Sequence, residues 1–162
     1  MKEIKKEIII KVFDDTDSFS SLEKELINRA VKAQESAYAK YSNFRIGSAV
    51  LLANGKIISG SNQENAVFPL GLCAERVALF SAGSTYPDVP VVALALSAEK
   101  KLREDEVPVF PCGSCRNVLI EQENKFGNKI KLFITGSNGK IYVVDTVEDI
   151  LPFAFSPRTL EK

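Results

Sequence analysis

Two cysteines stand three residues apart in the stretch Pro111-Cys112-Gly113-Ser114-Cys115-Arg116. We expect a helix over residues 113–123, so that both sulfurs lie on one side of its first turn. Backbone N–H groups and the helix dipole at that end favour thiolate over thiol. The same pair also fits a redox disulfide or two small buried side chains. Taken alone, it leaves metal, redox and packing roles open.

The third cysteine opens a second expected helix, over 73–82, in the stretch Cys73-Ala74-Glu75-Arg76. Every cysteine of the chain thus falls at a helix start, and the sequence contains 0 histidines. Three thiolates suit zinc better than a disulfide, and they leave one coordination position open, as catalytic zinc sites do. Beside such a metal, Glu75 would exchange a proton with water, although a first-turn glutamate more often only stabilises the helix dipole. The pattern predicts a catalytic zinc site.

Composition excludes several other classes of protein. A chain of 162 residues with 45% apolar and 26% charged residues is typical of one globular domain. Its 21 basic and 21 acidic residues cancel, so no excess of cations favours nucleic acid. The absence of histidine excludes a Ser-His-Asp triad. No signal peptide or membrane span is recognisable, and an odd number of cysteines without one favours reduced thiols in a soluble, cytoplasmic protein.

Local patterns predict the order of helices and strands. A mixed sheet with helices on both faces follows from that order. We divide the chain into an N-terminal extension, 1–20, and a domain, 21–162; within the extension, the β-branched segment 4–13 fits either an extra strand or a partner-binding arm. A solvated loop is expected over 99–106. The predicted helices are 21–39, 73–82, 113–123 and a short one after Thr146, and the strands are 44–52, 56–61, 89–97, 130–135 and 141–144.

The motifs, taken in order, resemble the zinc-dependent cytidine deaminases, specifically the small form with three cysteine ligands. The resemblance covers about Leu22 to Leu160 and implies an α/β fold, a three-layer α-β-α sandwich with a mixed five-stranded sheet. The wider superfamily usually carries H-x-E before P-C-x-x-C, and here Cys73 replaces the histidine. The matching segments are 37–47, Asn62-Gln63-Glu64-Asn65-Ala66, 69–76, 111–116 and 151–155.

The resemblance implies a role for each residue at the metal. Cys73, Cys112 and Cys115 would hold one zinc ion per chain, and Glu75 would be the catalytic proton shuttle. Arg76 would hydrogen-bond the ligand sulfurs and offset the charge of about −1 that zinc carries with three thiolates. A zinc-activated hydroxide would deaminate cytidine, and also deoxycytidine, to the uridine nucleoside and ammonia, a reaction of pyrimidine salvage.

The resemblance also implies substrate-binding residues and a partner. Phe44 would pack against the pyrimidine ring, Asn62 and Glu64 would bind the ribose hydroxyls, and Ala74 would be a further substrate-binding position. Phe155 would reach the active site of a neighbouring subunit in a homotetramer with shared sites. Two positions depart from the family's pattern. Lys40 replaces a frequent proline and should alter only a turn, whereas Asn117 replaces the usual glutamine near Cys115.

Three other functions compete with this interpretation. The first is deamination of another cytosine compound, such as the antibiotic blasticidin S. The intact ribose motif at 62–65 argues against this function. A polynucleotide deaminase would need a cationic groove and stacking aromatics, whereas the chain has net charge 0 and 0 tryptophans. A non-enzymatic zinc module predicts four protein ligands and no position for solvent.

Overall fold

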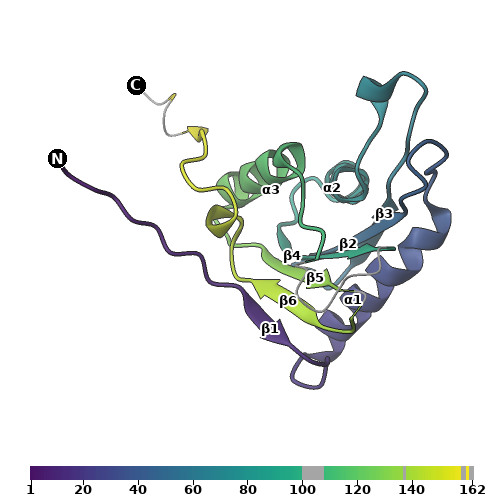
Figure 1. The fold of residues 1–162 in the computed structure, drawn as a ribbon, viewed down its shortest axis with the longest axis horizontal. Helices are drawn as coiled ribbons and strands as arrows, with labels where there is room; N and C mark the ends of the chain where they lie inside the picture. The colour runs from purple at the N-terminus through teal and green to yellow at the C-terminus, as the bar shows by residue number, and fades with distance from the viewer. Residues whose placement is uncertain (100–107, 137, 158–159, 161–162) are drawn as a thin grey trace.

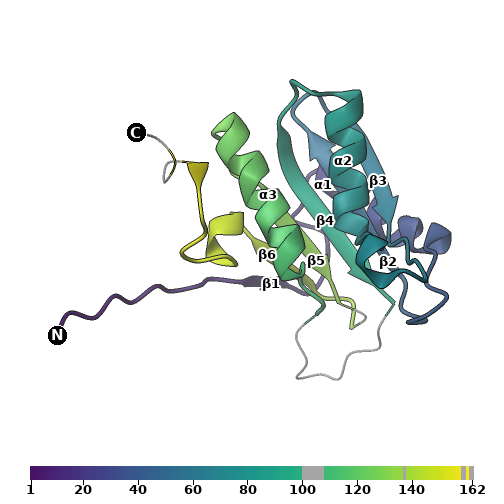
Figure 2. The same cartoon turned by 90° about the horizontal axis from the view of Figure 1, so that it is seen from above.

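A computed structural model describes residues 1–99, 108–136, 138–157 and 160. Most of the loop expected over 99–106 lies outside these residues. Figure 1 shows one sheet with α1 on one face and α2 and α3 on the other, and Figure 2 shows α2 and α3 running along the same face. The predicted three-layer α-β-α sandwich is confirmed. None of the described helices is long and apolar enough to cross a membrane.

The sheet is mixed, as predicted, but it has six strands where five were expected. The additional strand is β1, which pairs antiparallel with β6 and places Phe13 opposite Ile141. The Phe13 ring packs edge-on against Phe19 at 4.9 Å between centroids, and this aromatic contact anchors the strand at the sheet edge. The strands are β1 (Lys11–Phe13), β2 (Ile46–Leu52), β3 (Ile57–Ser61), β4 (Val91–Ala98), β5 (Lys131–Thr135) and β6 (Ile141–Val144), in the spatial order β1-β6-β5-β4-β2-β3.

The helices begin where the sequence predicts and end elsewhere. A capping box between Ser20 and Glu23 starts α1, Ser21–Ala33, which passes into a short 3₁₀ turn, Gln34–Ser36. This helix stops before residue 39 because Tyr38 instead bridges to Gln63 beside the site. The other helices run past their expected ends: α2 spans Ala74–Thr85 and α3 spans Gly113–Phe126, where Gly127 closes it at φ 67°.

Two apolar clusters, one on each face, hold the layers together. The first joins α2 and α3 to the sheet, and the second joins α1 to the opposite face. Two glycines allow the closest approach of helix and strand. A Cβ at Gly47 would lie 2.1 Å from the Ala30 oxygen of α1, and one at Gly60 would lie 2.5 Å from the Ala78 nitrogen of α2. The Gly60 contact fixes the distance between α2 and β3, and hence the position of the helix start that carries Cys73.

Candidate metal centre and adjoining pocket

Three cysteine sulfurs meet where α2 and α3 begin. Cys73 is the N-cap residue of α2, Cys112 is the N-cap residue of α3, and Cys115 lies in the first turn of α3. The Cys73 and Cys112 sulfurs are 3.8 Å apart, and those of Cys112 and Cys115 are 3.5 Å apart. Two helix N-termini therefore direct their partial positive charge toward the same sulfur cluster.

The geometry of this cluster fits a zinc ion. Tetrahedral zinc with Zn–S bonds of about 2.3 Å holds its sulfur ligands roughly 3.8 Å apart. The three sulfurs all lie within 4.8 Å of one another, and no disulfide joins them. The sequence contains 3 cysteines and 0 histidines, so it offers no fourth thiolate and no imidazole to close the coordination sphere. Such a donor set leaves a position for a non-protein ligand.

Neighbouring groups adjust the charge of the cluster. Hydrogen bonds from Cys115 and from the Arg76 guanidinium together lower the pKa of Cys73 to about 5 against the opposing effect of burial. Arg76 Nη2 lies 3.7 Å from the Cys73 sulfur. Hydrogen bonding to Cys73, together with burial, raises the pKa of Cys115 well above its ordinary value. Negative charge is therefore concentrated on Cys73, a sulfur to which the guanidinium donates a hydrogen bond.

Glu75 lies beside the sulfurs in the first turn of α2, and it is only 3% exposed. Burial, together with the charge on Cys73, raises the pKa of this carboxyl to about 7, against the opposing effect of hydrogen bonding to its own backbone N–H. A buried carboxyl whose pKa stays raised beside a guanidinium is a candidate for proton exchange near neutral pH. This arrangement can hold a proton next to the open coordination position.

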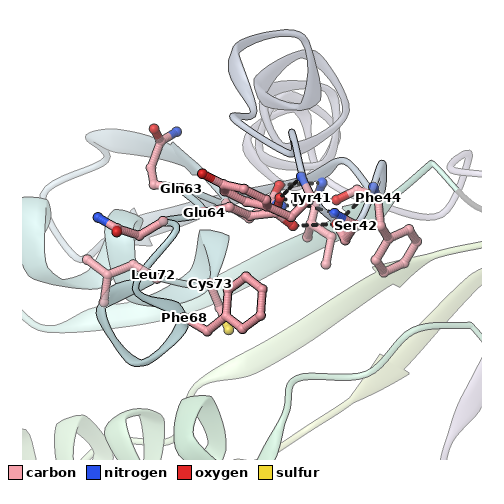
Figure 3. A pocket seen from close by; sticks show the side chains of 12 residues that line it. Tyr41, Ser42, Phe44, Gln63, Glu64, Phe68, Leu72 and Cys73 are labelled. Carbon is pink, nitrogen blue, oxygen red and sulfur yellow. Dashed lines mark hydrogen bonds between the residues drawn. The ribbon is translucent and has the colours of Figure 1, made fainter.

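A pocket of about 530 Å³ adjoins the cluster and has Cys73 in its wall. Figure 3 shows Glu64 hydrogen-bonded to Tyr41 and Ser42 on one part of the lining, with Phe68 and Cys73 on another. The Tyr41 and Phe68 rings meet edge to face at 5.8 Å between centroids. A mostly apolar wall with a few convergent polar groups suits a flat, polar-edged ring joined to a hydroxylated group.

The polar groups of this pocket are already held in place. Glu64 accepts hydrogen bonds from the Tyr41 N–H at 2.7 Å, from the Ser42 N–H at 3.2 Å and from Ser42 Oγ, and these bonds lower its pKa. Asn62 is 8% exposed; its Oδ1 accepts from the Ile46 N–H at 2.8 Å and its Nδ2 donates to the Phe44 oxygen at 3.0 Å. Asn62 thus fixes the backbone that presents Phe44 to the pocket.

The chain matches the family described as "Cytidine and deoxycytidylate deaminase zinc-binding region" over residues 20–126. This match includes all three cysteines. The chain belongs to the cytidine and deoxycytidylate deaminase family. The predicted zinc site is confirmed as a zinc-binding region of that family, because the same three sulfurs form the cluster suited to one metal ion.

Individual relatives agree with this family. A cytidine deaminase of Halalkalibacterium halodurans is 41% identical over 131 residues, which cover 81% of this chain and 92% of the relative. A cytidine deaminase of Sporosarcina psychrophila is 37% identical and covers 83% and 92%. The crystal structure of a cytidine deaminase from Burkholderia pseudomallei superposes with a TM-score of 0.71 at 39% identity and covers 82% of this chain and 98% of that one. The likeness therefore extends to nearly the whole length of these proteins.

The structure brings together all but one of the residues that the sequence singled out. Arg76 and Glu75 lie at the sulfurs, and Ala74, fully buried, begins α2 beside them. The lining of the pocket includes Phe44, Asn62 and Glu64. Phe155 is the exception: it is 66% exposed in the tail after the 3₁₀ turn Val147–Asp149 and is not part of this pocket within its own chain.

Two site residues escaped the sequence analysis, although both lie in its quoted motifs. Ser42 joins Glu64 to the Phe44 backbone, since its Oγ also accepts from the Phe44 N–H at 3.1 Å. Arg116 donates to the Pro111 oxygen at 2.7 Å and to the Ile150 oxygen at 2.8 Å, and so ties the start of α3 to the C-terminal segment. Their spacing in the sequence carries no signal of these long-range contacts.

The two departures from the family's pattern lie away from the sulfurs. Asn117 Nδ2 donates to the Gly113 oxygen at 2.9 Å within the first turn of α3, and its side chain is exposed. Lys40 lies in an exposed turn after the bridge at Tyr38. Among the described contacts, neither side chain touches a cysteine.

Ser42→Ala is expected to raise KM about ten-fold while kcat changes little. The variant loses the Oγ that holds Glu64 and caps the Phe44 N–H, and a hydrogen bond to a charged group is worth about 1.5–3 kcal/mol. Steady-state kinetics with cytidine measure both constants. Ser81→Ala, an exposed position on α2, is the matched control. An unchanged KM in Ser42→Ala would show that Glu64 does not need this support.

Proposed function

We propose that this protein is a zinc-dependent cytidine deaminase that hydrolyses cytidine to uridine and ammonia. The observation that carries the proposal is the three-sulfur cluster, which has the buried carboxyl of Glu75 beside it and shares Cys73 with the wall of a ring-sized pocket. The relatives that cover most of this chain, at 41% and 37% identity, are cytidine deaminases.

The chain's own residues supply the proton transfers. When bound by the three cysteines, zinc would activate a water molecule as the nucleophile. Glu75 accepts the proton of that water and delivers it to N3 as the oxygen adds to C4 of the base. Glu75 then takes the remaining proton from the oxygen added to C4 and passes it to the amino group, and the C4–N bond breaks to release ammonia as the C4 carbonyl forms. The position of Glu75, two residues after Cys73 and shielded from solvent, supports this role.

The pocket residues bind and orient the nucleoside. Phe44 packs against the pyrimidine ring, and Ala74 lies where the base meets the start of α2. Glu64 accepts hydrogen bonds from the ribose hydroxyls. Asn62 donates to the ribose the second N–H of its side-chain amide, since the first is bonded to the Phe44 oxygen. Deoxycytidine, which lacks one hydroxyl, is a second substrate. The shared position of Phe44, Asn62 and Glu64 on one pocket wall supports these assignments.

The direct test is to incubate the zinc-loaded protein with cytidine, deoxycytidine and blasticidin S in parallel. Loss of the cytosine absorbance together with stoichiometric ammonia measures each rate. We expect turnover of both nucleosides and little of blasticidin S, since the ribose-binding motif would have no matching partner. Turnover of blasticidin S alone would replace the proposed substrate, and no turnover by fully zinc-loaded protein would favour a non-enzymatic zinc module.

We further propose that four chains assemble and share their active sites through Phe155. This aromatic ring is 66% exposed, and Phe153 beside it is 83% exposed at φ 61°. Large aromatic side chains left in solvent mark surfaces that a partner covers. A ring closing over a neighbour's pocket would exclude water from the bound base. The free, unpaired cysteines favour a reducing compartment, the cytoplasm, as the place of this assembly.

Phe155→Ala is expected to raise KM about ten-fold, because stacking and burial worth roughly 1.4 kcal/mol are lost. The decisive measurement uses two inactive or weakened proteins, Glu75→Gln and Phe155→Ala, unfolded and reassembled together. Some sites of the mixed assembly would then contain both intact residues and regain activity. Mixed assemblies confirmed by mass but no more active than the two separate proteins would exclude a shared site. Loss of thermal stability without a change in KM would instead assign Phe155 to its own chain's core.

A further inference from the structure

The N-terminal arm, defined here as residues 4–10, leaves apolar side chains in solvent. Ile4, Ile8, Ile9 and Ile10 are 77%, 49%, 62% and 37% exposed. Figure 1 shows this segment running away from the body of the molecule. It precedes the region that matches the deaminase family, which begins at residue 20. The match to the deaminase family therefore does not account for the exposed isoleucines of the arm.

The arm continues directly into an edge strand. The sheet ends with β1, whose inner side pairs with β6, and no other strand of the described chain pairs with its outer side. Val12, in the middle of this strand, is 52% exposed. An open edge with apolar side chains is a template for pairing with another strand, and natural proteins rarely leave one uncovered. The outer edge of β1 and the arm thus form one continuous pairing surface.

The two faces of the arm follow from the register of β1. Val12 lies opposite Tyr142, which belongs to the core under α2 and α3, and Phe13 lies opposite Ile141, on the α1 side. Side chains alternate along an extended chain. Ile8 and Ile10 therefore continue the Val12 face, whereas Ile9 lies on the other face between Glu7 and Lys11.

We propose that the arms of two copies of this chain pair antiparallel about a two-fold axis at Ile9. In this register Ile9 lies opposite Ile9 of the second copy, Ile8 lies opposite Ile10, and Glu7 lies opposite Lys11. The pairs at the axis and the two next to it on either side then join apolar to apolar or acid to base, and farther out Lys6 lies opposite Val12. The pairing covers the exposed isoleucines and joins the two sheets edge to edge.

Neighbouring registers lack this complementarity. An axis at Ile8 sets Lys5 opposite Lys11 and Lys6 opposite Ile10. An axis at Ile10 sets Ile9 opposite Lys11. Like charges directly opposite one another destabilise a strand pair, and a lysine opposite an isoleucine next to the axis gains neither an ion pair nor an apolar contact. The sequence of the arm thus selects Ile9 as the centre, and the partner it selects is a second copy of itself.

Single cysteines in the full-length, zinc-loaded protein test the register. Paired residues of antiparallel strands have Cα atoms about 4.5–5.5 Å apart, within the range of a disulfide. Under mild oxidation, Ile9→Cys is expected to form a covalent dimer on a non-reducing gel. Ile8→Cys and Ile10→Cys should cross-link to each other when mixed far faster than either does alone. The unsubstituted chain measures the background from the three native cysteines.

Ile4→Cys is the matched control, since position 4 lies on the same arm but not opposite itself. Cross-linking of Ile4→Cys and Ile9→Cys at equal rates would show a mobile arm without register and overturn the proposal. So would Ile9→Cys at the background level. Adding Glu7→Lys to Ile9→Cys should slow cross-linking about five-fold, and adding Lys11→Glu to that variant should restore most of the rate. A rate indifferent to both charges would exclude the proposed pairing.

Discussion

Glu75→Gln is expected to keep its zinc and lose at least 10²–10⁴-fold in kcat, the range typical of a general acid–base residue. Glutamine has the size and shape of glutamate, so the buried position, 3% exposed, stays filled. An amide cannot accept the proton of the attacking water, however, and cannot pass one to N3 or to the leaving amino group. Steady-state kinetics with cytidine and zinc analysis of the same sample measure the two quantities.

The matched control is Glu123→Gln, a second buried glutamate on α3, 8% exposed. Its carboxylate accepts from the Ile130 N–H at 2.7 Å and the Val147 N–H at 3.0 Å, and it binds the Thr146 hydroxyl. Replacing one of its oxygens with an amide nitrogen should cost about 1–3 kcal/mol of stability and leave kcat unchanged below the melting temperature. A Glu75→Gln protein with normal kcat would end the assignment of Glu75 as the proton carrier.

Cys112→Ala and Cys115→Ala are each expected to lose zinc, because two thiolates form a far weaker site than three. Activity should fall to background in both variants. Cys112 is exposed and Cys115 is buried, so only the second variant adds a packing defect. Loss of zinc from Cys112→Ala therefore reports ligation alone. Zinc per chain, measured after dialysis against a chelator, checks the expectation.

The control for this pair is Ser114→Ala, which lies between the two cysteines on the exposed side of α3. It should hold one zinc ion per chain after the same dialysis. Removing zinc from the unsubstituted protein should also lower its melting temperature, since the metal joins the starts of two helices that are separate in sequence. Full zinc occupancy in both cysteine variants would show that the Cys-x-x-Cys pair does not bind the metal.

Local chemistry decided which segments became helices and turns. The Ser20–Glu23 capping box starts α1, and Asn54-Gly55 and the Asn138-Gly139 step form turns in which both glycines have positive φ. Each of these signals depends on residues only a few positions apart, so each can be recognised in the sequence. The same holds for the placement of every cysteine at a helix start, from which zinc could be predicted without coordinates.

The ends of elements and the sixth strand depended on partners distant in sequence. The sequence of residues 4–13 fitted either a strand or an arm. Residues 11–13 form a strand, which the packing of Phe13 on Phe19 stabilises. Propensity alone could not choose, because an edge strand of three residues is stabilised by its neighbours and not by its own pattern. The division between an extension at 1–20 and a domain at 21–162 stays a prediction.

The sequence by itself determined the ligand types, the place of Glu75, the expected proton carrier, two residues after Cys73, and the helices that present them. Only the tertiary structure decided that sulfurs 39 residues apart in sequence lie 3.8 Å from each other. It also decided that Ser42 holds Glu64, and that Phe155 lies outside its own chain's pocket. The physical reason is that packing of α2 and α3 against one face of the sheet sets these distances. Such packing joins residues whose separation along the chain carries no periodic signal.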